Sequence, residues 1–97
     1  MQTLEIITLK FGEKKNIPIL VSSTYGGTFE ITNATFQLMI GDTVEASGAC
    51  EVEQLNMSEC IVKALLEPLR KNATYKLIYW YDIYPQRLTY ECLIRVI

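Results

Sequence analysis

The fold is decided by two stretches rich in β-branched and aromatic residues, Ala73-Thr-Tyr-Lys-Leu-Ile-Tyr-Trp-Tyr-Asp82 and Arg87-Leu-Thr-Tyr-Glu-Cys-Leu-Ile-Arg-Val-Ile97. Short runs of such side chains, bounded by turn residues, are typical of strands. The loop Ile83-Tyr-Pro-Gln86 predicts that the two strands pair as an antiparallel hairpin. The pairs expected on its inner face are Tyr81 with Leu88, Tyr79 with Tyr90 and Leu77 with Cys92.

Further strands are predicted upstream, at the close spacing typical of sandwiches and barrels. They cover Thr3–Lys10, Ile17–Ser22, Ala34–Ile40, Thr43–Glu53 and Glu59–Ala64. Pro18 places the second of them at a sheet edge or at a bulge, because proline cannot donate a ladder hydrogen bond. The segment Leu65–Asn72 is expected to link two strands, with room for one helical turn.

The 97 residues contain no repeat, low-complexity tract or linker, so a single domain over residues 1–97 is expected. An apolar fraction of 49% is ordinary for a globular protein with one core. We predict an all-β fold, an immunoglobulin-like antiparallel β-sandwich of about seven strands. The residues expected in its core include Phe36, Leu38, Val62, Leu77 and Tyr79.

The turn between the strands Thr43–Glu53 and Glu59–Ala64 sets the register of a second hairpin. If the turn is centred on Leu55, Cys50 lies opposite Cys60. The same register places Val52 opposite Ser58. The apolar face then comprises Val44, Ala46, Cys50, Val52, Cys60, Val62 and Ala64.

The cysteines Cys50, Cys60 and Cys92 make an odd count without a closely spaced pair, which suits a reducing compartment better than a disulfide framework. A metal site made only of cysteine normally needs four thiolates. We therefore expect three inward-facing free thiols. A cross-strand disulfide between Cys50 and Cys60 stays open for an oxidised protein.

Catalytic machinery is not recognisable in the sequence. There is no histidine, which removes the commonest general base and histidine-bearing zinc sites. Gly26-Gly27 is interpreted as a turn, because no Lys-Ser/Thr follows it to complete a phosphate loop. We interpret four glutamates as a solvated acidic face: Glu45, Glu51, Glu53 and Glu59. The functional alternative is that this face docks a basic partner. A carboxylate-only enzyme would need two of them in one pocket. We expect no enzymatic activity, cofactor, metal or small-molecule substrate.

Charge and targeting signals limit the partners. The net charge is −2, and the basic pairs Lys14-Lys15 and Arg70-Lys71 are isolated, so we expect no binding to nucleic acid. No apolar run approaches the roughly 20 residues that a membrane helix needs, and no secretory signal is evident. Asn33-Ala-Thr, Asn56-Met-Ser and Asn72-Ala-Thr nevertheless match the acceptor pattern for N-glycosylation. A secreted or cell-surface immunoglobulin-like binding domain is therefore the alternative.

The polar turn Asn72-Ala-Thr places Tyr75 at the start of the penultimate strand, as in the tyrosine corner of immunoglobulin-like domains. We expect the Tyr75 hydroxyl to bond the backbone near Pro68–Asn72, and the alternative is an exposed hydroxyl. Together with Phe29-Glu-Ile-Thr-Asn-Ala-Thr-Phe-Gln-Leu38 and Gly48-Ala-Cys-Glu-Val52, this stretch resembles small phage tail and baseplate proteins. The resemblance is to the immunoglobulin-like N-terminal module of the phage baseplate upper protein, which has a hydrophobic-Asp-Leu-Thr-Gly-Ala motif where this chain has Phe29-Glu-Ile-Thr-Asn-Ala34.

The resemblance implies a structural or assembly role in a phage or prophage particle. Modules of this kind have no catalytic residues to carry over, and their ligands are protein surfaces. The implied partners are other virion proteins or a second copy of the chain. The implied location is the virion, or the bacterial cytoplasm during assembly.

The register of the last hairpin also predicts a candidate partner-binding face. It directs Ile78 and Trp80 outward, alongside Glu91 and Leu93. An apolar outer face is unusual for a lone soluble domain, so Trp80 is the expected anchor for a protein partner. The alternative is a shift of one residue in register, which would place Trp80 in the core.

Overall fold

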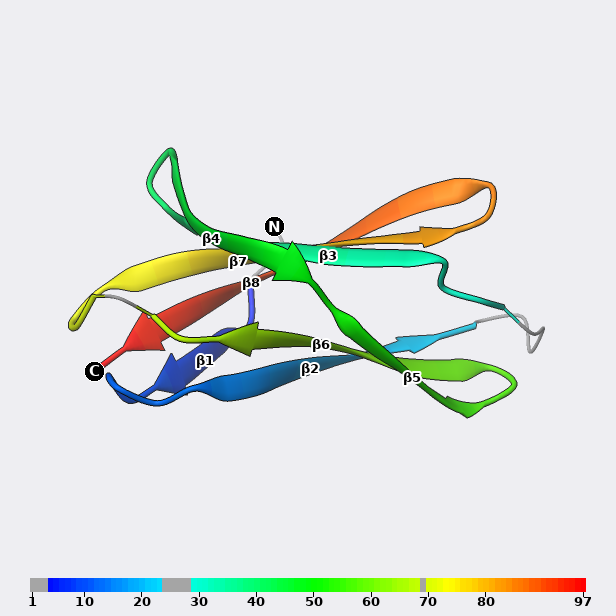
Figure 1. The fold of residues 1–97 in the computed structure, drawn as a ribbon, viewed down its shortest axis with the longest axis horizontal. Coiled ribbons are helices and arrows are strands. Elements are labelled where there is room, and N and C mark those ends of the chain that lie inside the picture. The colour runs from blue at the N-terminus through cyan, green and yellow to red at the C-terminus, as the bar shows by residue number, and fades with distance from the viewer. Residues whose placement is uncertain (1–3, 24–28, 69) are drawn as a thin grey trace.

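The computed structural model describes residues 4–23, 29–68 and 70–97, which form eight strands in two sheets and no helix (Figure 1). The five-stranded sheet has the order β1-β8-β7-β3-β4, with β1 (Ile6–Leu9), β3 (Asn33–Ile40), β4 (Thr43–Ala49), β7 (Thr74–Ile83) and β8 (Gln86–Val96). The three-stranded sheet has the order β2-β6-β5, with β2 (Lys15–Ser22), β5 (Glu51–Asn56) and β6 (Glu59–Leu66).

This strand order is that of an immunoglobulin-like sandwich. Strands β8, β7, β3 and β4 occupy the places of strands G, F, C and C′ in that fold, and β2, β6 and β5 occupy those of B, E and D. The predicted all-β sandwich is therefore confirmed, with one strand more than the seven expected.

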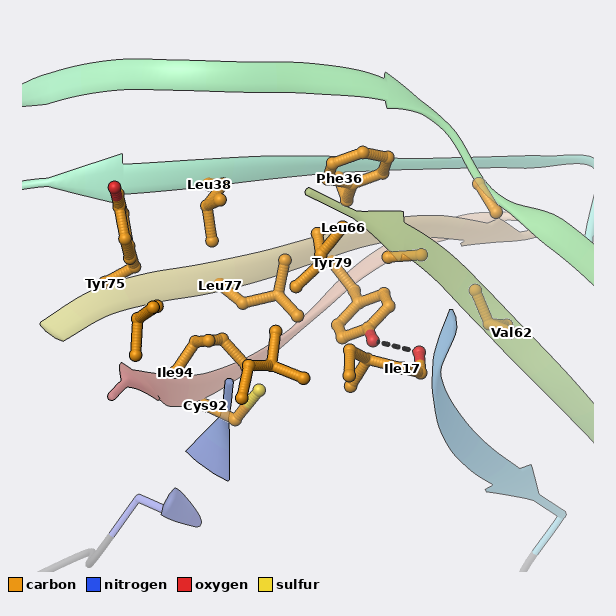
Figure 2. Close-up of a cluster of buried hydrophobic side chains, with 14 residues drawn as sticks. Ile17, Phe36, Leu38, Val62, Leu66, Tyr75, Leu77, Tyr79, Cys92 and Ile94 are labelled. Carbon is orange, nitrogen blue, oxygen red and sulfur yellow. Dashed lines mark hydrogen bonds between the residues drawn. The ribbon is translucent and has the colours of Figure 1, made fainter. Parts of the chain in front are cut away.

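The core lies between the two sheets and is filled by the inward-facing residues of six strands, β1, β2, β3, β6, β7 and β8 (Figure 2). All of the core residues predicted from the sequence are buried: Phe36, Leu38, Val62, Leu77 and Tyr79. The Tyr79 hydroxyl donates a hydrogen bond of 2.5 Å to the backbone carbonyl of Ile17, which ties β7 in one sheet to β2 in the other. Tyr79 therefore contributes both apolar area and a polar link between the sheets.

The predicted register of the last hairpin is confirmed. Strands β7 and β8 pair Leu77 with Cys92 and Tyr79 with Tyr90, and the two tyrosine rings lie 6.2 Å apart. The turn that joins them contains a cis peptide bond before Pro85. Alternation along both strands then directs every second side chain away from the core.

The predicted strand Thr43–Glu53 is two strands in different sheets, which accounts for the additional strand. Strand β4 pairs with β3, and after Cys50 the chain crosses to the other layer, where β5 pairs with β6 (Figure 1). The Cys50 backbone N–H still donates to the Ala34 carbonyl at 2.8 Å, so the crossing begins where this last bond to β3 ends.

The predicted hairpin centre at Leu55 is wrong. Val52 pairs with Val62, and Gln54 pairs with Cys60. The turn lies at Met57 and Ser58, because the Asn56 side-chain oxygen accepts a hydrogen bond of 2.9 Å from the Ser58 N–H.

The predicted apolar face of this hairpin is correct for β6 and for Ala46 and Cys50, which are partly buried against the core. Cys60, Val62 and Ala64 are buried, whereas Val44 and Val52 are exposed. The two valines lie on β4 and β5, the edge strands of the two sheets, so each has a neighbouring strand on one side only.

Three further expectations concern the strand ends and edges. Strand β1 pairs with β8 in parallel, so the sandwich is not wholly antiparallel as predicted. Pro18 lies on β2, an edge strand, as expected. In residues 67–68 and 70–73 the structure contains no helical turn, and Asn72 instead adopts a φ of 56°, a conformation that asparagine tolerates better than most residues. The predicted strand start at Thr3 and the turn at Gly26-Gly27 lie outside the described residues.

Candidate functional site

The outer face of the five-stranded sheet carries Trp80. Its side chain is 39% exposed, so the alternative register that would have buried it is wrong. Trp80 lies between Thr35 of β3 and Thr89 of β8, both exposed and too short to cover an indole ring. The ring is therefore accessible from solvent.

An apolar stripe leads from Trp80 across this face, and we define it as Ile6, Leu93, Ile78 and Trp80. Ile78 lies two residues before Trp80 on β7, and Leu93 lies diagonally across from Ile78 on β8. Ile6 of β1 pairs with Leu93 and is 61% exposed, whereas Leu93 and Ile78 are half-buried. The stripe therefore crosses three adjacent strands.

A charged pair, Lys76 and Glu91, crosses the stripe between Leu93 and Ile78. Glu91 pairs with Ile78 across β7 and β8, and its carboxylate lies 3.1 Å from the Lys76 ammonium group. Both side chains are partly exposed, so this ion pair contributes little to stability. The four partner-binding residues predicted from the sequence, Trp80, Ile78, Leu93 and Glu91, thus share one face. Ile6 was missed, because its pairing with β8 joins residues from opposite ends of the sequence.

Two depressions lie at the ends of the stripe. One, of about 420 Å³, is lined by Ile6 and Leu93 together with residues at the ends of β7 and β8. The other, of about 390 Å³, surrounds Trp80, and its lining residues are Asn33, Thr35, Gln37, Trp80, Asp82 and Arg87. The first has mainly aliphatic walls near the stripe, whereas the second is lined by the indole ring and by side chains that each carry a polar group.

The polar depression is organised by the Asp82 carboxylate. Arg87 donates to it from Nε at 2.9 Å and from a terminal nitrogen at 3.4 Å, and Asn33 donates from Nδ2 at 3.3 Å. The Arg87 hydrogen bond holds the pKa of Asp82 below its ordinary value, with a smaller contribution in the same direction from Asn33. Asp82 therefore remains ionised at neutral pH, and the pair with Arg87 leaves the depression with no net charge.

Tyr75 is buried on the opposite side of β7. Its hydroxyl donates to the Glu45 carboxylate at 2.7 Å, and Arg70 lies 3.5 Å from the same carboxylate. Burial raises the pKa of Tyr75 to about 12, the Glu45 hydrogen bond and charge add to this increase, and a backbone hydrogen bond with Arg70 opposes it. The alternative of an exposed hydroxyl is therefore wrong. The backbone of Arg70 lies within the segment expected to bond the hydroxyl, and the Glu45 side chain on β4 is an additional partner that was not predicted.

The predicted acidic face forms only in part: Glu51 and Glu53 are exposed on β5, as expected, whereas Glu45 is not. Glu45 has a side chain only 8% exposed and belongs to the Tyr75 contact, which corrects its assignment to that face. Glu53 is paired with Lys63 at 3.0 Å, and Glu59 accepts a hydrogen bond from Asn56. In the part of the chain that the structure describes, no three His, Cys, Asp or Glu side chains converge as a metal site would require.

The three cysteines are free thiols. Cys60 and Cys92 are buried, whereas Cys50 is half-buried at the crossing between the sheets and does not lie opposite Cys60, contrary to the prediction. Burial raises the pKa of both Cys50 and Cys92 to about 11 and also raises that of Cys60. A thiol with a raised pKa is protonated at neutral pH and is a poor nucleophile.

Fold and surface together define an immunoglobulin-like β-sandwich with an apolar stripe on one sheet. Comparison of the chain with models of protein families, with curated proteins and with solved structures finds no match. Within residues 4–23, 29–68 and 70–97, no helix is long and apolar enough to span a membrane.

Proposed function

We propose that this domain is a non-enzymatic assembly module that holds another protein against the outer face of its five-stranded sheet. The observation that carries the proposal is the exposure of Trp80 at the end of an apolar stripe. Tryptophan is enriched among the residues that contribute most to binding energy at protein interfaces. The half-buried Ile78 and Leu93 extend the area that a partner would remove from water.

The resemblance to phage tail and baseplate modules supports a role in a phage or prophage particle. The partner is then another virion protein or a second copy of this chain, located in the virion or in the bacterial cytoplasm during assembly. The absence of histidine from the sequence favours binding over catalysis.

The alternative, a secreted or cell-surface binding domain, rests on the three acceptor asparagines. Asn33, Asn56 and Asn72 are all exposed, as attachment of a glycan requires. The mass of the protein purified from its native source distinguishes the two. An increase by the mass of one or more glycans supports the alternative, and the unmodified mass supports the particle module.

The test of the main proposal is Trp80→Ala, with Tyr84→Ala as a matched control. Tyr84 is an aromatic residue that is 90% exposed, and it lies in the turn beyond the stripe. Association is measured by sedimentation, for the domain alone and with the proteins encoded beside it. We expect Trp80→Ala to weaken association by about 2 kcal/mol or more, and Tyr84→Ala to leave it unchanged.

Urea unfolding of the same variants separates an interface role from a core role. Because Trp80 keeps 39% of its surface exposed, its truncation should cost less stability than the roughly 3 to 5 kcal/mol that a core tryptophan costs. A large loss of stability with unchanged association would refute the proposal. Equal association of the two variants would also refute it.

A further inference from the structure

The depression around Trp80 differs in chemistry from the apolar stripe that ends there. Five of its six lining side chains are polar: Asn33, Thr35, Gln37, Asp82 and Arg87. An apolar side chain of a protein partner inserted here would remove Thr35 and Gln37 from water without giving them hydrogen bonds, at a cost of about 1 to 3 kcal/mol for each group left unpaired. The depression therefore suits a ligand that carries its own hydroxyl groups.

The charges in the depression indicate a neutral ligand. Asp82 and Arg87 are its only charged lining residues, and they are bound to each other through two hydrogen bonds. A phosphate or carboxylate ligand would have to compete with Asp82 for the guanidinium group, and a cationic ligand would have to compete with Arg87. A neutral ligand can use the outward-facing atoms of the pair without breaking it.

The single aromatic residue of the depression indicates a ring with an apolar face. Trp80 is flanked by Thr35 and Thr89, so a flat ligand can approach the indole without meeting a long side chain. Its neighbour Gln37, which is half-buried opposite Ile78, presents an amide that both donates and accepts. A volume of about 390 Å³ lies near the lower end of the range for ligand sites, roughly 300 to 1,000 Å³. The space suits one or two rings rather than an extended chain.

We propose that this depression binds a neutral saccharide, with a sugar ring stacked on Trp80 and its hydroxyl groups hydrogen-bonded by Asn33, Gln37 and the Asp82–Arg87 pair. The C–H face of a pyranose provides the apolar surface for the indole. Its hydroxyls provide donors and acceptors for the polar walls. This inference goes beyond the proposed function, because it assigns a second class of ligand to the same face.

The fluorescence of Trp80 gives a direct assay, since the chain contains only one tryptophan. The probes are glucose, galactose, mannose, N-acetylglucosamine and their β-linked disaccharides, each titrated into the full chain. We expect at least one of them to change the emission saturably, with a Kd in the range of about 1 mM. The absence of a saturable change with every probe would overturn the proposal.

Two variants locate the ligand. Gln37→Ala removes a polar wall of the depression and should weaken saccharide binding by at least about fivefold. Leu93→Ala lies at the other end of the stripe and should leave saccharide binding unchanged. Urea unfolding confirms that both variants are folded. Unchanged binding by Gln37→Ala, or weakened binding by Leu93→Ala, would place the sugar elsewhere and overturn the proposal.

The same variants distinguish this proposal from the assembly role. Leu93→Ala should weaken protein association and leave saccharide binding intact, whereas Gln37→Ala should do the reverse. If no probe binds and Gln37→Ala weakens protein association, the depression is part of the protein interface and the saccharide proposal is wrong. If a saccharide binds and neither Leu93→Ala nor Trp80→Ala affects association, the saccharide site stands and the assembly role fails.

Discussion

The hydrogen bond from Tyr79 to Ile17 is the contact whose removal tests the packing of the two sheets most directly. Tyr79→Phe deletes one oxygen atom from a side chain that is 0% exposed, and the ring that fills the core remains. The carbonyl of Ile17 then lies in a buried environment without its hydroxyl donor. Leaving a buried acceptor unsatisfied costs about 1 to 3 kcal/mol, so we expect a loss of that size in the free energy of unfolding.

The assay is urea unfolding at pH 7, with the slope of the transition as a check that the surface exposed on unfolding is unchanged. Tyr90→Phe is the matched control, because the Tyr90 hydroxyl donates to Glu5 at 3.0 Å in an exposed position. Its loss should stay within about 0.5 kcal/mol. If Tyr79→Phe costs no more than Tyr90→Phe, the bond between the sheets does not contribute to stability and our reasoning is wrong.

Three further predictions concern the core and its thiols. A Cβ at Gly48 would lie 3.2 Å from the Phe36 ring, so Gly48→Val should cost about 1 to 3 kcal/mol in urea unfolding, and an unchanged midpoint would contradict this contact. Cys60 and Cys92 should react with an aromatic disulfide reagent only at the rate of unfolding, whereas the half-buried Cys50 should react first; equal rates in native buffer would argue against the burial. Because the pKa values of Cys50 and Cys92 are raised to about 11, the unfolded state releases these protons first. The contribution of these two thiols to stability should therefore be constant at neutral pH and be lost as the pH rises from about 9 towards 11, and stability that stays constant from pH 8 to 10.5 would refute the shift.

The last hairpin could be predicted from the sequence because its information is local. Strands β7 and β8 are joined by a short turn, and this turn defines the register in which Leu77 pairs with Cys92 and Tyr79 with Tyr90. The outward position of Trp80 followed from that register. The candidate face was therefore predictable as far as β7 and β8 extend.

The remaining errors arise where local pattern carries no information. All six residues of β5 are exposed, so no alternation fixes its register against β6, and the turn at Met57 could not be placed. Strands β4 and β5 are separated by Cys50 alone, and the chain is extended on both sides of it. The apolar pattern therefore does not reveal that the chain changes sheets at this residue. The pairing of Ile6 with Leu93, and hence the far end of the stripe, depends on a contact between distant residues that no local signal reveals.

The parallel pairing of β1 and β8 determines how the domain responds to mechanical load. The two strands run side by side, with Ile6 beside Leu93 and Leu9 beside Val96. A force that pulls the chain before β1 and the chain after β8 in opposite directions slides these strands along each other. Backbone bonds such as Leu93 N–H to Glu5 C=O and Ile97 N–H to Leu9 C=O then carry the tension together instead of opening one after another. A domain tethered at both ends within a larger structure would resist extension through this shear geometry, and its lifetime under force would be set by the rate of unfolding.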